Sequence, residues 1–175
     1  GGYAMQDGRR IASDGRDWFG RKFKGVEAGS VFAVPLPDGT YAFGRLMNAK
    51  DGATIAEFFR ARRMTPEFDP EILQSGRLFG PVGVLIGDIE GPNRKRPWKV
   101  VHKDPEYYPD DLYDIPFFQG MGAGTWQYFT LNNHFEILGP VADEDVGNWK
   151  VASIMPQHPE QITKMIVRQL ARQGL

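Results

Sequence analysis

The chain contains no cysteine among its 175 residues, which excludes disulfide bonds, thiolate metal ligands and a cysteine nucleophile. It also lacks any apolar run near the roughly 18 residues that a membrane-spanning helix requires. The N-terminal residues hold no apolar stretch like that of a signal peptide, and the formal net charge is only −1. We therefore expect a cytoplasmic protein that does not associate with membranes.

Residues that interrupt helices are abundant, with 21 glycines and 13 prolines. The chain is nevertheless 41% hydrophobic and 13% aromatic, which is enough for one ordinary hydrophobic core. No repeat, low-complexity stretch or linker divides it. We predict a single domain over residues 1–175, with an irregular lead-in over residues 1–26.

Short apolar segments separated by turn residues predict a sheet. Residues 30–35 and 41–47 flank Asp38-Gly39, which favours a tight hairpin turn because glycine accepts a positive φ. A second Asp-Gly pair precedes residues 53–59, the predicted third strand of a meander. Four further strands are predicted, over residues 82–87, 98–102, 135–138 and 149–153.

Two helices are predicted beside these strands. Asp69 can cap a short helix over residues 69–75, and Pro70 fits its first helical position. A C-terminal helix over residues 157–173 is predicted from one apolar stripe, formed by Ile162, Ile166 and Leu170. The predicted fold is therefore mainly β within the α+β class, an antiparallel twisted sheet or partly open barrel with a C-terminal α-helix.

Recognisable catalytic and metal-binding motifs are missing from the sequence. The three histidines, His102, His134 and His158, lack the paired spacing of a metal site. No serine lies in a G-x-S-x-G elbow, and the glycine-rich run at residues 120–124 lacks the spacing of a dinucleotide-binding loop. We expect no metal, no cofactor and no catalysis, although a site assembled across several strands stays open.

Charge changes sign abruptly in the middle of the chain. Residues 94–103 carry five basic side chains and no acid, whereas residues 104–114, here called the acidic segment, carry five acids and no base. The basic run could serve a nucleic-acid-binding barrel through Arg94, Lys95, Arg96, Trp98 and Lys99. Against this alternative, the neighbouring carboxylates would repel phosphates.

The acidic segment is also rich in tyrosine, which is enriched at protein interfaces because it offers a large contact area at a low entropic cost. Carboxylates beside the tyrosines would steer a basic partner into contact. We predict a partner-binding surface formed by Asp104, Glu106, Tyr107, Tyr108, Asp110, Asp111, Tyr113 and Asp114. A plain solvated loop is the alternative interpretation.

Residues 27–46 read EAGSVFAVPLPDGTYAFGRL. This opening resembles the immunity protein 26 family of bacterial polymorphic toxin systems, with its glycine, Phe-containing strand, Asp-Gly turn, aromatic pair and Gly-Arg. Phe58-Phe59, Ile72-Leu73 and the apolar residues 82–86 follow the family's order, so the resemblance covers about residues 27–118 and is patchy after residue 60. It implies a protein that binds and neutralises a cognate protein toxin. A basic toxin, such as a nuclease, would suit the acidic segment.

Overall fold

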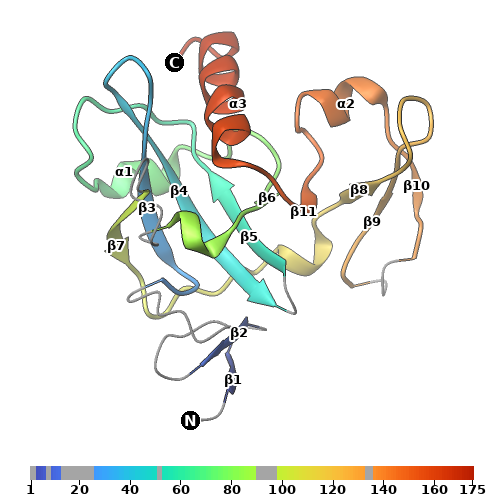
Figure 1. Ribbon diagram of the computed structural model, residues 1–175, viewed down its shortest axis with the longest axis horizontal. Coiled ribbons are helices and arrows are strands. Elements are labelled where there is room, and N and C mark those ends of the chain that lie inside the picture. The colour runs from blue at the N-terminus through green and yellow to red at the C-terminus, as the bar shows by residue number, and fades with distance from the viewer. Residues whose placement is uncertain (1–2, 7–8, 13–25, 51–52, 90–97, 133–135) are drawn as a thin grey trace.

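The computed structural model describes residues 3–6, 9–12, 26–50, 53–89, 98–132 and 136–175. In this part of the chain a six-stranded sheet forms the body of the molecule, and a three-stranded antiparallel sheet lies to one side of it (Figure 1). The C-terminal helix α3 (Pro159–Arg172) packs on the larger sheet. The predicted α+β class and the C-terminal helix are confirmed.

The larger sheet grows from the predicted meander. Strands β3 (Ser30–Pro35), β4 (Tyr41–Lys50) and β5 (Ala53–Phe58) pair antiparallel in sequence order. The other strands are β6 (Val82–Gly83), β7 (Lys99–Lys103) and β11 (Ser153–Pro156), and the order across the sheet is β11-β6-β5-β4-β3-β7. Because β11 pairs parallel with β6, the sheet is mixed, where the sequence predicted an antiparallel one.

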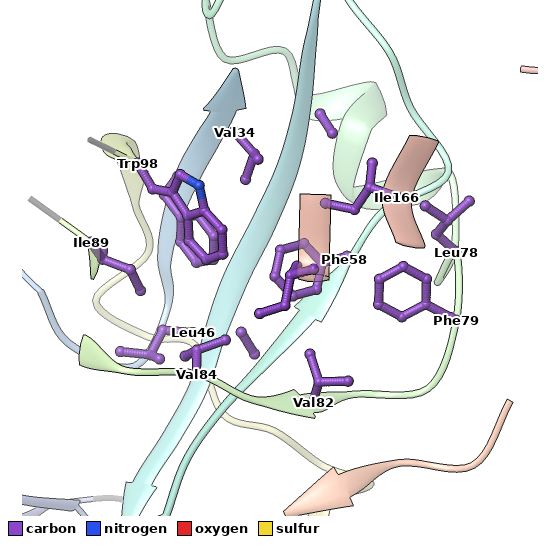
Figure 2. Packing of buried hydrophobic residues seen from close by; sticks show 14 of the residues in the cluster. Val34, Leu46, Phe58, Leu78, Phe79, Val82, Val84, Ile89, Trp98 and Ile166 are labelled. Carbon is purple, nitrogen blue, oxygen red and sulfur yellow. The ribbon is translucent and has the colours of Figure 1, made fainter. Parts of the chain in front are cut away.

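One face of this sheet carries the largest hydrophobic cluster (Figure 2). Phe32 and Trp98 stack with parallel rings at 5.5 Å, and the ring of Phe58 meets Trp98 edge-on at 6.0 Å. Helix α3 closes the cluster from above with the three residues of its predicted stripe, Ile162, Ile166 and Leu170. Burial of these apolar side chains is the main force that fixes the helix to the sheet.

The opposite face carries two smaller clusters. In the first, Phe43 and Phe59 pack against Ile72 of α1 (Pro70–Gln74). This helix begins as predicted, since the Asp69 side chain accepts a hydrogen bond from the amide of Glu71 at 2.9 Å. The second cluster joins β4 and β5 to the smaller sheet and consists of Met47, Ile55, Leu112, Ile115, Phe117, Phe129 and Ala152.

The smaller sheet was not predicted. Its strands are β8 (Phe117–Gln119), β9 (Gln127–Phe129) and β10 (Gly139–Pro140), in the order β10-β9-β8, and helix α2 (Asp143–Gly147) follows. Two short 3-10 helices, η1 (Ile86–Asp88) and η2 (Leu112–Asp114), complete the described elements.

Several predicted boundaries are wrong. The strand predicted over 82–87 ends at Gly83, where the backbone of β11 comes so close that a Cβ atom would lie 2.7 Å from the carbonyl oxygen of Ile154. The strand predicted over 149–153 starts only at Ser153: Trp149 lies in a turn with a positive φ of 56°, and Ala152 forms an isolated bridge to Phe117. Residues 136–138, the described part of the strand predicted over 135–138, are irregular.

The lead-in over residues 1–26 is not wholly irregular. Strands β1 (Tyr3–Gln6) and β2 (Arg9–Ala12) pair antiparallel, and β2 contacts β4. A short hairpin therefore precedes the body of the fold. None of the helices in the described ranges has the length and apolar character needed to cross a membrane.

Candidate partner-binding surface

The acidic segment packs against the second face of the larger sheet and is not a free loop. Leu112 near its end is buried with Met47 of β4 and Ile55 of β5. At its start, the amide of Asp104 donates to the carbonyl of Gly29, and the amide of Tyr107 donates to the carbonyl of Asp104. The contacts of Asp104 and Leu112 thus fix the start and the end of the segment to the body of the protein.

A buried carboxylate lies beneath the segment. Glu57 of β5 is only 4% exposed, and it pairs across the sheet with Arg45 of β4. Its Oε2 atom lies 3.2 Å from Nε of Arg45, and its Oε1 atom lies 3.3 Å from Nε of Arg77. A buried carboxylate is tolerated only when its charge and its lone pairs are satisfied, and here each oxygen faces a guanidinium group.

Two residues of the acidic segment join this arrangement. The hydroxyl of Tyr107 donates to Oε2 of Glu57 at 3.1 Å, and the guanidinium of Arg45 lies 4.2 Å from the centre of the Tyr107 ring. Arg77 donates to both oxygens of Asp111, at 2.7 and 3.1 Å. We call these five residues, Arg45, Glu57, Arg77, Tyr107 and Asp111, the Glu57 cluster.

The electrostatics of the Glu57 cluster follow from these contacts. Burial raises the pKa of the Tyr107 phenol, and the negative charge of Glu57 raises it further. The hydrogen bonds from Arg77 lower the pKa of the Asp111 carboxyl. Tyr107 is therefore a neutral donor and Asp111 an ionised acceptor at neutral pH, as the observed hydrogen bonds require.

The other predicted contact residues of the acidic segment lie outside the Glu57 cluster, and most of them are exposed. Asp104 is half-buried, and its side chain accepts a hydrogen bond from the amide of Glu106 at 3.0 Å. Tyr108 is 59% exposed and Tyr113 is 39% exposed. We call Glu106, Tyr108, Asp110, Tyr113 and Asp114 the exposed set. Asp111 is also exposed, with 56% of its side chain accessible, but its carboxylate is held by Arg77, and Tyr107 is half-buried and bonded to Glu57.

A pocket of about 430 Å³ opens beside the segment. Its charged lining consists of two basic and two acidic side chains, those of Arg77, Lys150, Asp111 and Asp114. The remaining walls are mostly apolar and come from Phe79, Gly80, Pro81, Ile115, Pro116 and Ala152. Because the charges balance, the pocket offers a concave surface next to the exposed set and no concentrated charge for a free ion.

Reasoning from the sequence missed Arg45, Glu57 and Arg77. A signal for Glu57 was present, because a single acid interrupts the apolar residues 53–59, and a charge at an inward position needs a partner. Arg45 follows Gly44 in the hairpin that carries the family resemblance. Its cross-strand partner could be identified only once the register of β4 and β5 was known.

The alternative function, nucleic-acid binding, required the Trp98 ring to be available for stacking on a base. Trp98 is 2% exposed and stacked on Phe32, so its ring cannot stack on a base. Arg94, Lys95 and Arg96 lie outside the described residues, and Lys99 is exposed on β7. The base-stacking role predicted for Trp98 is therefore wrong.

The histidines form no site in the part of the chain that can be described. His102 stacks on Phe68 with ring centres 3.9 Å apart, His158 directly precedes α3, and His134 lies outside the described residues. Within the described ranges, no group of three or more histidines and carboxylates is arranged to hold a metal ion. The exposed set remains the candidate for the partner-binding surface predicted from the sequence.

A family model described as Immunity protein 26 matches residues 27–128 of the chain, which is more than half of its length. No curated protein and no solved structure matches. The matched residues run from before β3 to β9 and include the acidic segment and the whole Glu57 cluster. Strands β10 and β11 and helices α2 and α3 follow the matched region.

Proposed function

The chain belongs to the immunity protein 26 family, and we propose that it neutralises a basic toxin in the bacterial cytoplasm by binding it through the exposed set. Family membership makes it an immunity protein of a toxin–immunity system, with a cognate toxin as its partner. Such proteins are generally non-catalytic, in agreement with the expectation from sequence.

The proposal rests on one observation: within the acidic segment, the residues that attach it to the sheet differ from those that are available to a partner. Tyr107 and Asp111 hold the segment on the sheet, while three carboxylates and two tyrosines of the exposed set face outward. A pre-organised segment loses little conformational entropy when it binds a partner. Its negative charge would accelerate encounter with a basic protein.

A nuclease is the kind of toxin that fits this surface best. Nucleases bind phosphates, so their clefts are lined by lysine and arginine. A row of fixed carboxylates can occupy such a cleft and exclude nucleic acid. If this is correct, the immunity protein will compete with a labelled oligonucleotide for binding to an inactivated toxin domain.

The test is a double charge reversal, Asp110→Lys with Asp114→Lys. Binding is measured by surface plasmon resonance against the purified toxin domain encoded by the neighbouring reading frame. We expect the association rate to fall by about 10- to 100-fold, because electrostatic steering is lost, with an unchanged Tm. Both side chains are exposed and Asp111 is left in its ion pair, so the fold should not be disturbed.

The matched control is Glu67→Lys with Glu71→Lys, which makes the same charge change at exposed positions beside and within α1. The control should keep most of the wild-type association rate. Equal rates for the wild type and both double variants, with the same dependence on salt, would contradict the proposed binding site.

A further inference from the structure

The smaller sheet buries one face and leaves aromatic rings on the other. Phe117 and Phe129 are paired across β8 and β9 and point into the second cluster. Because side chains alternate along a strand, their neighbours Phe118 and Tyr128, also paired, lie on the opposite face. Trp126 meets Phe118 edge-on at 5.4 Å. We call Phe118, Trp126 and Tyr128 the aromatic face; all three are half-buried.

Two glycines hold these rings in place. A Cβ atom at Gly120 would lie 2.7 Å from Cε3 of Trp126, and one at Gly139 would lie 3.1 Å from Cε1 of Tyr128. The rings therefore lie directly on backbone that carries no side chain, and they pack there as aromatic residues do over glycines in sheets. Their orientation is fixed before any partner arrives, which lowers the entropic cost of contact.

The aromatic face lies within a long stretch of a single charge sign. Residues 104–149 contain nine aspartates and glutamates and no lysine or arginine, so all 21 basic residues lie elsewhere. Its later part, which comprises η2, the smaller sheet and α2, lies at one side of the molecule (Figure 1). Arg77 and Lys150 reach this side from outside the stretch and pair with Asp111 and Asp145, and the other carboxylates would attract a basic partner.

The smaller sheet adjoins the acidic segment at the end of β9. The backbone amide of Asn132, just after β9, donates to the carbonyl of Tyr113 at 3.0 Å, and its side-chain amide lies 3.5 Å from Oδ1 of Asp114. The chain then runs from Asp114 directly into β8. The end of the smaller sheet and the exposed set are thus joined by hydrogen bonds and by sequence.

From these observations we infer that the aromatic face forms the apolar centre of the toxin-binding surface, and that the exposed set forms its charged rim. This inference rests on the proposed function. Interfaces concentrate tryptophan, tyrosine and phenylalanine at their centre and charge at their edge. A basic toxin also brings arginine and lysine side chains, which bind favourably over tryptophan and tyrosine rings.

The test combines two truncations with a footprint of the wild-type protein. Trp126→Ala and Tyr128→Ala are each expected to weaken binding of the same toxin domain by about 30-fold or more, mainly through faster dissociation. The matched control is Phe68→Ala, a half-buried aromatic residue that stacks on His102. It should leave the affinity unchanged. In the wild-type complex, amides of residues 117–128 should gain protection from hydrogen exchange.

The outcomes separate this inference from the proposed function. Consider a toxin that binds the wild type and whose binding is weakened by the double lysine variant. If the alanine variants then bind it as tightly as the wild type, and residues 117–128 gain no protection from hydrogen exchange, the aromatic face is not in the interface and the proposed function stands. Protection of residues 117–128 by a concentration-dependent dimer, without toxin, would also overturn the inference. Absence of toxin binding by the wild type would overturn the proposed function itself.

Discussion

Substitution of Glu57 by glutamine tests whether the Glu57 cluster stabilises the fold. The change keeps the size of the side chain and removes its charge. Arg45 and Arg77 then lose the carboxylate that each contacts at 3.2 and 3.3 Å, and the new amide nitrogen brings N–H groups against guanidinium donors. Both arginines keep less than a third of their side chains exposed, so water can replace the lost partner only in part.

The magnitude follows from the burial of the pair. Removing one partner of a buried ion pair costs about 3–5 kcal/mol. Arg77 keeps its two hydrogen bonds to Asp111, and both arginines reach some solvent, so we expect the lower limit, about 3 kcal/mol. For a domain of this size, each kcal/mol lowers Tm by about 2–4 °C, which predicts a decrease of about 6–12 °C.

The assay is thermal and urea unfolding followed by circular dichroism. Arg62→Gln is the matched control, because Arg62 forms an exposed ion pair with Asp38 at 3.4 Å. Exposed pairs contribute little, so the control should unfold at the wild-type temperature. If Glu57→Gln and the control have the same Tm, the buried cluster does not stabilise the fold and our account of how the acidic segment is held fails.

Two further substitutions test the same region. Tyr107→Phe removes one hydrogen bond to a carboxylate and should cost about 1.5–3 kcal/mol in urea unfolding. The pKa of Tyr107 is raised in the folded state, so the free energy of unfolding should decrease as pH rises above 10. This decrease should be smaller in Tyr107→Phe, and equal pH dependence in both proteins would refute the assignment of the decrease to Tyr107. Phe117→Ala empties a site with 0% exposure and should cost about 3–5 kcal/mol; a loss below about 1 kcal/mol would mean that the second cluster is not a packed core.

The elements that the sequence predicted are those whose cause is local. In the first hairpin, Gly39 adopts a φ of 85°, and the Asp38 side chain accepts a hydrogen bond from the amide of Thr40 at 2.9 Å. In α1, the capping side chain of Asp69 and the amide of Glu71 that it accepts from are only two residues apart. The stripe of α3 needs only a helical period. Each of these features can be recognised in a short window of sequence.

The elements that were missed depend on distant partners. Glu57 contacts residues that are 12, 20 and 50 positions away, and Arg77 contacts Asp111 at a separation of 34. Strands β8, β9 and β10 have two or three residues each, too few for a period to show. The parallel pairing of β6 with β11 joins Val82 to Ser153, and no local pattern encodes it.

In the acidic segment, the residues that attach it to the sheet differ from those available to a partner, and this affects how specificity for a toxin can change. Tyr107 and Asp111 hold the acidic segment through hydrogen bonds with Glu57 and Arg77, whereas the side chains of the exposed set are accessible to a partner. Substitutions at exposed positions usually change stability by about 0.5 kcal/mol or less, so the charge and shape presented to a toxin can change while the segment stays in place. Substitutions in the Glu57 cluster alter the support on which every exposed position depends. Recognition of a different toxin is therefore expected to require changes in the exposed set, with the Glu57 cluster kept intact.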